Sequence, residues 1–386
     1  MDEHSYFFLG NCQTQYLSSM LGAVSSAERY FLGHRYGVNL ALDGPLVPCV
    51  DKAEFFAAAA AAKKAGRRTI LVLQETSRSR FAKRMERKKK QFSDTVLIPH
   101  VGFKSQWPEP GKDGQPLSES KIRRMWEWEK HEFLGKLERS GMQDHRAFAD
   151  VFWHRATTQL RFYHPGHPNG SLFAEILEQM RPNLIDVMPF LDDLAAALRR
   201  SEGIYQNSNH TVEPRVVAAL GLEWGRTDFY RAWQGLAESG SADGVQDAVA
   251  RAREVIGDPE RLSVVTWPFQ AHFRSALGQA CVRLGDREAG IGYLQQAAVE
   301  LKGHGPTVRR TLTQAVRAGR PDAIESVLVG VAPHLVVFEE EHPGFRGCFQ
   351  AVLGMSEGRQ TLTRVQDQTD PQSWVHRYIG RMMAAA

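Results

Sequence analysis

The sequence predicts an α/β domain built on a parallel sheet, followed by an all-α domain of helical hairpins. Over residues 1–225, short apolar runs alternate with helix-like segments. Strand–helix–strand order of this kind favours parallel strands with helices on their faces. Over residues 226–386, strand-like runs nearly vanish. A chain of 386 residues is also too long for one ordinary core, which favours two domains.

The first predicted element is a strand, followed by a tight turn and a helix. An apolar run at 5–9 leads into Gly10-Asn11-Cys12-Gln13, and residues 14–21 have a helical pattern. Cys12 is therefore expected at or next to a helix N-terminus, where backbone N–H groups and the macrodipole favour an anion. A thiol there is expected to lose its proton readily and to act as a nucleophile. The alternative is that Cys12 is a small buried apolar side chain.

Two further strands are expected at 69–73 and 95–98, where apolar and β-branched residues predominate. In parallel sheets with covering helices, ligands bind beyond the carboxyl ends of the strands. Cys12, Gln74 and His100 each follow or end a predicted strand. We therefore expect these three residues to share one crevice.

The remaining elements of this domain follow from the same patterns. Helices are expected at 52–65, 122–137 and 171–180, and proline- and glycine-rich loops at 106–120 and 162–170. The two prolines of the second loop predict irregular backbone there. Several aromatic side chains are expected in the core, although a tryptophan in the first loop is also placed to stack on a sugar or an adenine. These aromatic residues are Phe103, Trp107, Trp126, Trp128 and Trp153.

The carboxyl-terminal domain shows one repeat-like segment, at 271–300. Its leucine and glycine spacing, with a Gly285-Asp286 turn, resembles a tetratricopeptide repeat. Three positions depart from that pattern: Arg274 replaces an aromatic residue, Cys281 a tyrosine and Gly290 an alanine. The segments at 232–256 and 312–328 have hairpin length. An irregular helical-repeat domain is predicted, which either holds a protein partner or shapes an acceptor site.

Composition limits the classes of protein that fit. Hydrophobic residues make up 42% and charged residues 24%, as in a soluble globular protein, and a net charge of +4 does not argue for nucleic acid. The four cysteines are scattered without a CxxC pair, which favours a reducing compartment. The alanine run 57–62 is too short to span a membrane, and the acidic start lacks a signal-peptide pattern. A cytoplasmic location without a transmembrane segment is expected.

The loop 162–170 carries two histidines, at positions 164 and 167. A thiol nucleophile needs a base, and that base is usually distant in sequence. Prolines beside His164 and His167 would hold an imidazole in place at little entropic cost. Alternatively, the histidines belong to a solvated surface turn. A zinc pair is less favoured because no third ligand with suitable spacing stands nearby, and no metal is predicted.

A run of basic residues follows the strand that ends near Gln74. Between positions 78 and 90 there are eight Lys or Arg residues and one acid, Glu86. Such a run is usually a solvated helix face. At the mouth of the crevice it would also bind the phosphates of a nucleotide-like cofactor. The residues expected to do so are Arg78, Arg80, Lys83 and Arg84.

Three motifs together resemble the WcbI-type capsular polysaccharide biosynthesis proteins. They are Leu9-Gly10-Asn11-Cys12-Gln13, then Leu73-Gln74 with Ile98-Pro99-His100-Val101-Gly102-Phe103, and Tyr163-His164-Pro165-Gly166-His167-Pro168-Asn169. The resemblance covers about residues 5–180. It implies binding of coenzyme A or acetyl-coenzyme A, with Gly10 among the cofactor-binding residues. It also implies acyl transfer to a glycan acceptor.

The motifs are also similar to a distorted SGNH-hydrolase arrangement, which implies an SGNH- or flavodoxin-like sheet. By that resemblance Cys12 attacks, His167 is the base and His164 orients it. The resemblance places the oxyanion and substrate contacts on a second set of residues, namely Asn11, Gln13, Gln74, His100 and Asn169. A direct route, in which His167 deprotonates a sugar hydroxyl, is equally open, and His100 is a rival base.

The leading hypothesis is a coenzyme A-dependent acyl (acetyl) transferase in capsule or exopolysaccharide biosynthesis. Two alternatives remain at this point. One is an SGNH-like carbohydrate esterase, which would ignore coenzyme A. The other is a non-catalytic interaction protein of the tetratricopeptide type.

Overall fold

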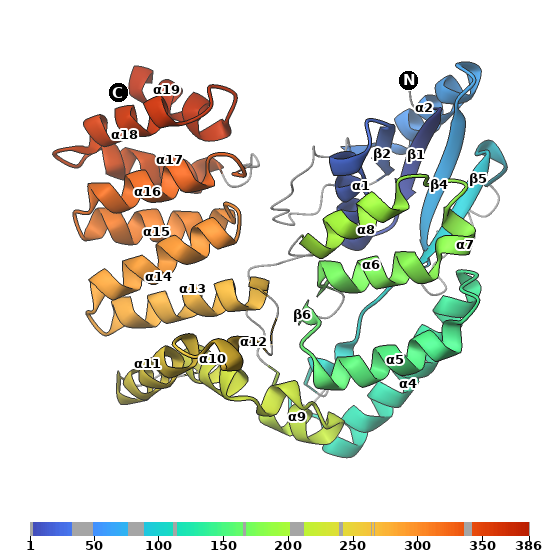
Figure 1. Ribbon diagram of the computed structural model, residues 1–386, viewed down its shortest axis with the longest axis horizontal. Coiled ribbons are helices and arrows are strands. Elements are labelled where there is room, and N and C mark those ends of the chain that lie inside the picture. Colours follow the sequence, from blue (N-terminus) through green and yellow to red (C-terminus); the bar gives the residue numbers. More distant parts are fainter. Residues whose placement is uncertain are drawn as a thin grey trace. The chain divides into compact units, whose positions relative to one another are not determined.

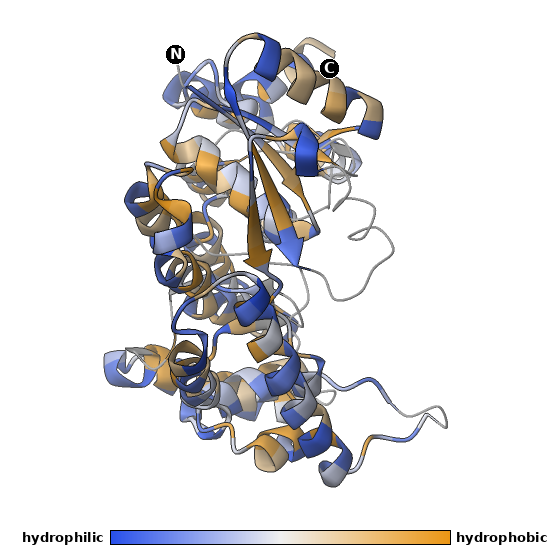
Figure 2. Ribbon diagram, turned by 90° about the vertical axis from the view of Figure 1, so that its right-hand side faces the viewer, coloured by the Kyte–Doolittle hydropathy of each residue, from blue (hydrophilic) through white to orange (hydrophobic). Residues whose placement is uncertain are grey.

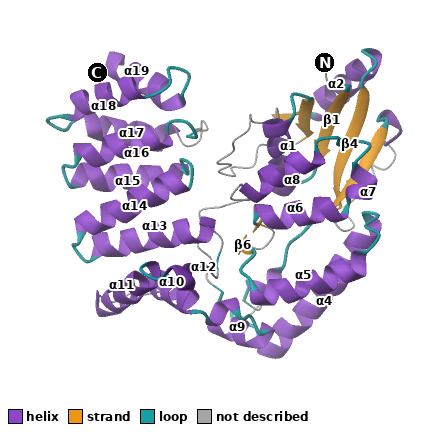
Figure 3. Cartoon of the chain, in the orientation of Figure 1, coloured by secondary structure: helices purple, strands orange, loops and turns teal. Residues whose placement is uncertain are grey.

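The chain divides into two compact units, residues 1–223 and 224–386 (Figure 1). All the strands among the described residues lie in the first unit, as Figure 3 shows by colour. The α/β architecture followed by a helical domain is therefore confirmed. The computed structural model describes residues 3–32, 49–75, 89–110, 114–164, 167–200, 212–238, 242–263, 265, 267–335 and 342–385.

The described part of the first unit contains seven strands, and its helices include three-residue 3-10 turns labelled η. In chain order its elements are β1 (His4–Leu9), α1 (Cys12–Val24), β2 (Glu28–Leu32), β3 (Cys49–Val50), α2 (Lys52–Lys64), β4 (Arg68–Glu75), η1 (Lys89–Gln91), β5 (Asp94–Pro99), η2 (Lys104–Gln106), α4 (Glu119–Arg139), α5 (His145–Thr158), β6 (Phe162–His164), β7 (His167–Pro168), α6 (Gly170–Gln179), α7 (Arg181–Leu184), α8 (Leu191–Arg200) and α9 (Pro214–Leu220).

Five strands form a parallel sheet in the order β3-β2-β1-β4-β5. Phe7 at the centre of β1 pairs with Tyr30 of β2 on one side and Leu71 of β4 on the other. The three strands predicted from apolar runs are β1, β4 and β5, and all three are found. Strands β2 and β3 were not predicted. The first carries Glu28 and Arg29 in its first two positions, and the second has only two residues, so neither forms an apolar run.

Both faces of the sheet are covered, which explains why the runs Tyr6–Leu9 of β1 and Ile70–Leu73 of β4 are continuously hydrophobic (orange in Figure 2). On one face, Phe7 and Leu71 pack with Phe55 of α2 in a buried cluster. On the other face α1 contacts β1, β2 and β4. There the Tyr6 hydroxyl donates to the Val187 carbonyl at 2.7 Å, ahead of α8.

The segment 162–170 differs from the irregular loop that was expected. Its backbone forms a short antiparallel hairpin of β6 and β7, in which His164 pairs with His167. Proline is compatible with this arrangement because Pro168 ends a two-residue strand, where no ladder N–H is needed.

The aromatic residues expected in the core divide between core and surface. Phe103 and Trp126 are buried together and pack edge to face at 6.0 Å. Trp128 is 63% exposed, so its predicted core position is wrong. Residues two apart on a helix do not share a face, and Trp128 therefore points away from the stripe of α4 that Trp126 occupies.

In the described residues of the second unit, helices joined by turns are the regular secondary structure. Its elements are η3 (Trp224–Arg226), α10 (Asp228–Glu238), α11 (Ala242–Ile256), α12 (Pro259–Ser263), α13 (Trp267–Arg283), α14 (Arg287–Glu300), α15 (Gly305–Arg317), α16 (Pro321–Val331), α17 (His342–Leu353), α18 (Gly358–Gln368) and α19 (Trp374–Ala385). Across the described part of the chain, no helix is both long enough and apolar enough to cross a membrane.

The helices α13 to α19 stack as successive hairpins (Figure 1). The predicted turn between α13 and α14 is confirmed: Gly285 has a φ of 87°, and the Asp286 side chain caps α14. The departure at Gly290 also has a physical reason. A Cβ there would lie 2.8 Å from the Gly278 carbonyl oxygen, so the two helices approach too closely for alanine.

Two buried histidines predict acid sensitivity of this unit. His304 accepts or donates a 2.8 Å hydrogen bond with Thr307, and its ring lies 5.7 Å from that of His272. Burial, with the charge of Arg310, lowers the pKa of His304 to about 3 and that of His272 well below its usual value. The unfolded chain therefore binds protons below about pH 6.5 that the native chain does not.

The free energy of unfolding is accordingly expected to fall from pH 6.5 toward pH 3, by about 1.4 kcal/mol per pH unit for each histidine. Urea unfolding of the full chain at pH 7 and pH 5 measures this. The variant His304→Asn should lose part of the pH dependence, whereas a control at exposed His131 should keep it. An identical pH dependence in all three proteins would contradict the assignment.

Candidate functional site

The candidate site lies at the carboxyl ends of β1 and β4. From β1 the chain moves outward to β2 and β3, and then returns to place β4 on the other side of β1. Two neighbouring parallel strands whose connections leave in opposite directions form a topological switch point, which is where open α/β sheets bind ligands. The turn that follows β1, at Gly10 and Asn11, lies at this point.

The turn between β1 and α1 is built by its side chains. Asn11 caps the helix: its side-chain oxygen accepts from the Gln13 backbone N–H at 2.9 Å. Gly10 is required by close approach, because a Cβ there would lie 2.0 Å from Thr14 Oγ1 and 2.7 Å from Gln74 Cβ. The helix thus begins at Cys12, as the sequence predicts.

Gln74, near the end of β4, holds this turn in place. Its side-chain oxygen accepts from the Asn11 backbone N–H at 3.0 Å and from Thr14 Oγ1 at 3.1 Å. Its side-chain nitrogen donates to Gln13 Oε1 at 3.0 Å. Gln13 in turn bonds both the N–H and the carbonyl of Val101, just after β5. One buried network therefore ties together the ends of β1, β4 and β5.

The network brings together residues that the sequence placed at the strand ends. It also shows what two of them do: Gln13 and Gln74 are 1% and 3% exposed and use their amide groups to position the turn. Asn11 and Cys12 are half-buried at the same place, and His100, directly after β5, is half-buried as well.

Cys12 corrects one expectation. Burial raises the pKa of the Cys12 thiol to about 11, although hydrogen bonds from the backbone N–H groups of Gln13 and Cys12 oppose this shift. The prediction that the helix N-terminus lowers the pKa of this thiol is therefore wrong. The physical reason is that desolvation of a thiolate outweighs the stabilisation by two N–H groups.

The loop after β5 is anchored by a carboxylate that the sequence analysis missed. Glu129 of α4 is 7% exposed and accepts from the Lys104 N–H at 2.7 Å, the Ser105 N–H at 3.2 Å and the Ser105 hydroxyl. Burial raises the pKa of Glu129, and these hydrogen bonds oppose the shift. A signal was present: Glu129 interrupts the apolar stripe formed by Ile122, Trp126 and Phe133.

The hairpin that carries His164 and His167 starts beside this loop, since the rings of Phe162 and Phe103 lie 5.2 Å apart. The two histidine side chains themselves lie outside the described structure. Asn169 is buried and caps α6, accepting from the Leu172 N–H at 3.0 Å. That bond gives Asn169 a structural role in ending the hairpin.

An ion pair between buried Arg161 and half-buried Glu175 fixes the start of the hairpin. Both guanidinium nitrogens of Arg161 donate to Glu175 of α6, at 2.9 and 2.6 Å, and Arg155 also bonds Glu175 at 3.0 Å. The Arg161 carbonyl accepts from the Asn169 N–H at 2.9 Å. Sequence reasoning missed this pair, and nothing in the pattern around Glu175 indicates it.

The phosphate-binding prediction concerns Arg78, Arg80, Lys83 and Arg84, which lie outside the described residues. The described end of the basic run, Lys89 and Lys90, opens η1 ahead of β5. It stays a prediction that the run binds phosphates.

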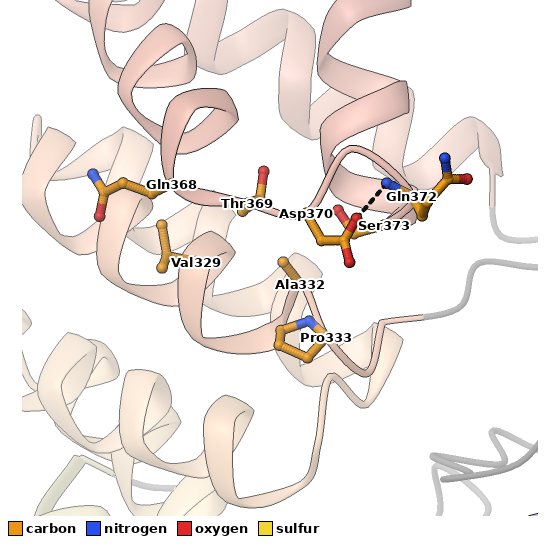
Figure 4. Close-up of a pocket in the computed structure, with 8 residues that line it drawn as sticks. All are labelled: Val329, Ala332, Pro333, Gln368, Thr369, Asp370, Gln372 and Ser373. Atoms are coloured by element: carbon orange, nitrogen blue, oxygen red, sulfur yellow. Dashed lines mark hydrogen bonds between the residues drawn. The ribbon is translucent and has the colours of Figure 1, made fainter.

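Two open hollows occur elsewhere in the described structure. One, of about 530 Å³, lies between α5, α6 and α8, and four of the charged side chains that line it form two ion pairs, Arg155 with Glu175 and Arg199 with Glu178. The other, of about 390 Å³, lies in the second unit between the end of α16 and the turn before α19 (Figure 4). There Asp370 accepts from the Gln372 N–H at 2.7 Å. Neither hollow contains a predicted site residue.

Comparison of the chain with models of known protein families, with curated proteins and with solved structures gave no match.

Proposed function

We propose that the α/β unit is a coenzyme A-dependent acyl (acetyl) transferase. Its acceptor would be a hydroxyl of a polysaccharide or sugar precursor, as in capsule or exopolysaccharide biosynthesis. The observation that carries the proposal is the Gly10-Asn11-Cys12 turn at the switch point between β1 and β4. Two of the three WcbI-like motifs meet at this edge of the sheet, because Gln74 and Val101 bond directly to this turn or its helix.

The chemistry of this edge suits a ligand with phosphates and a thioester. The N-terminus of α1 favours an anion or a developing oxyanion. The basic run at 78–90 directly follows β4 in the sequence, and cationic side chains there would bind the phosphates of coenzyme A. Arg78, Arg80, Lys83 and Arg84 are proposed for that contact.

The raised pKa of Cys12 favours direct transfer over an acyl-enzyme, because a neutral thiol is a poor nucleophile. In the direct route His167 takes the proton of the sugar hydroxyl, whose oxygen attacks the thioester carbonyl carbon. The carbon–sulfur bond then breaks, and His167 returns the proton to the departing coenzyme A sulfur. His164 would orient His167, and His100 is the alternative base.

Stabilisation of the oxyanion falls to the start of α1 in this proposal. The side chain of Asn11 and the Cys12 backbone N–H are its donors. A positioning role is proposed for Gln13, Gln74 and Asn169. The hydrogen bond between Gln13 and Gln74 ties the start of α1 to the end of β4, and Asn169 caps α6. Cys12 itself would lie against the thioester as a neutral side chain.

The finer description of the folds belongs to the same proposal. Strands β2-β1-β4-β5 follow the flavodoxin-like order, with β3 added at the edge, which is compatible with an SGNH-like sheet. The second unit is proposed to be tetratricopeptide-like, on the strength of the α13–α14 hairpin. A cytoplasmic location is proposed on cysteine usage alone.

Calorimetric titration of the full chain with coenzyme A and with acetyl-coenzyme A tests this function. Binding in the micromolar range, about −8 kcal/mol, is expected. Neutralising Arg78, Arg80, Lys83 and Arg84 together should weaken it at least tenfold. The matched control neutralises Lys63 and Lys64, two exposed residues at the end of α2 that lead into the opposite end of β4.

Equal binding by the control and the basic-run variant would remove the phosphate contact from the proposal. No binding of either ligand by the wild-type chain would overturn the transferase. Hydrolysis of acylated sugars by that same protein would then favour the carbohydrate esterase.

A further inference from the structure

Basic and acidic residues are unevenly distributed among the helices of the second unit. Four of them, α13, α15, α17 and α19, carry eight arginines and no lysine, aspartate or glutamate. Two arginines lie on α13, three on α15, one on α17 and two on α19. Residues 224–386 as a whole contain 18 basic and 18 acidic residues. Among the described residues, the carboxylates of this unit therefore lie on the other helices and on the connections.

These helices belong to one layer of the stack. Helix α15 contacts α17, and α17 contacts α19. Arg310 of α15 donates to Ser275 of α13 at 3.2 Å, which joins α13 to the same layer. The other layer consists of α14, α16 and α18, where α16 contacts both of its neighbours. That second layer carries acids and ion pairs, such as Glu325 with Arg364 at 2.7 Å.

A row of three packed aromatic rings, with an arginine at each end, runs across three helices of the layer formed by α13, α15, α17 and α19. The Arg309 guanidinium of α15 lies 5.6 Å from the Phe345 ring of α17. Phe345 packs 5.3 Å from Trp374 of α19, which stacks on Tyr378 at 4.4 Å. The Arg381 guanidinium lies 5.5 Å from that Tyr378 ring. Stacking on a ring restricts a guanidinium and so prepares it for a planar ligand.

Three of these arginines are available for an anion. Arg309 is half-buried, and Arg346 and Arg381 are exposed. No ion pair within 4.0 Å joins any of them to an acidic residue in the described part of the chain. Burial raises the pKa of Tyr378, and the charges of Arg346 and Arg381 both oppose that shift, so each of the two arginines lies near this side chain.

The spacing of the layer suits an extended chain. Packed helices lie about 8–10 Å apart, and an extended peptide rises about 3.3 Å per residue. Every third side chain of such a peptide would therefore meet the next helix. A guanidinium binds a carboxylate through two parallel hydrogen bonds, which favours arginine over lysine at such a site.

We propose that the layer formed by α15, α17 and α19 is a docking surface for an acidic, extended segment of a partner protein. The inference is independent of the acyl transfer proposed for the first unit. Two observations favour a peptide over a nucleic acid. The basic and acidic residues of the unit as a whole are equal in number, so its excess of positive charge is confined to this layer. The rings of Phe345 and Tyr378 are buried, so bases could not stack on them.

Fluorescence anisotropy with the full chain tests this surface. The probe is a labelled ten-residue peptide with glutamate at every third position and serine and alanine elsewhere. Saturable binding that weakens with added salt is expected. The triple variant Arg309→Gln, Arg346→Gln, Arg381→Gln should weaken it at least tenfold, with a far-UV spectrum like that of the wild type. The single variant Arg346→Gln removes an exposed side chain that stacks on no ring, and should weaken binding several-fold.

The matched control is Arg359→Gln, an exposed arginine on α18 in the other layer, and it should bind like the wild type. A peptide with glutamine in place of glutamate should not bind. Equal losses in Arg346→Gln and Arg359→Gln would overturn the proposal. So would the absence of binding to the wild type, or tighter binding of a single-stranded oligonucleotide at the same ionic strength.

Discussion

Replacing Glu175 by glutamine is expected to lower the free energy of unfolding of the α/β unit by about 3 kcal/mol. The Arg161 side chain is only 4% exposed, and both of its bonded nitrogens face Glu175. Removal of the carboxylate charge leaves the buried guanidinium of Arg161 without its counterion. Glutamine has nearly the same shape as glutamate but carries no charge, so it does not offset the cost of burying that guanidinium. The Arg161 carbonyl also accepts from the Asn169 N–H. We therefore expect the start of the histidine hairpin to become less ordered in the same variant.

A neighbouring pair on the same helix supplies the control. Glu178 bonds Arg199, but the two side chains are 33% and 45% exposed. Glu178→Gln is therefore expected to cost about 1 kcal/mol or less. Urea unfolding of the two variants beside the wild type measures the difference. Equal costs for the two substitutions would show that Arg161 does not depend on Glu175.

Cys12 is expected to react with iodoacetamide on the order of a hundredfold more slowly at pH 7.5 than an ordinary thiol does. A pKa of about 11 leaves a thiolate fraction well under one part in a thousand at that pH, against about one tenth for an unperturbed cysteine. The rate should rise about tenfold per pH unit between pH 7 and pH 9 without a plateau. Peptide mapping after timed labelling separates Cys12 from the other three cysteines.

The same chain unfolded in urea is the control, since its Cys12 should titrate near the usual value. A labelling rate that levels off near pH 7 in the native protein would mean a thiolate at neutral pH. That outcome would contradict the burial argument and favour the acyl-enzyme route over direct transfer.

Much of the fold was predictable because buried parallel strands are nearly continuous apolar runs. The central residues of β1, β4 and β5 follow this pattern. The helical character of the chain after residue 226 was predictable because strand-like runs nearly vanish there. The strand β2 was missed because Glu28 and Arg29 begin it, and β3 because two residues carry no pattern. Their places in the sheet depend on pairing with β1 and with each other, which no local window contains.

The position of the candidate site was predictable from the sequence, but the pKa of its cysteine was not. The rule on strand ends brings Gln74 to the turn after β1, and the hydrogen bond to Asn11 bears out that proximity. Local sequence does not reveal how deeply Cys12 is desolvated, and desolvation decides its pKa. The ion pair of Glu175 joins it to an arginine 14 residues away, so helical spacing alone does not show the pair.

The central claim is that coenzyme A binds at the carboxyl ends of β1 and β4. Hydrogen–deuterium exchange of the full chain, with and without saturating coenzyme A, tests it most directly. The account predicts slower exchange in peptides that cover the Gly10–Thr14 turn and the basic run after Gln74, with no change in α13–α19. Protection confined to other segments, with the Gly10–Thr14 turn unaffected, would contradict it.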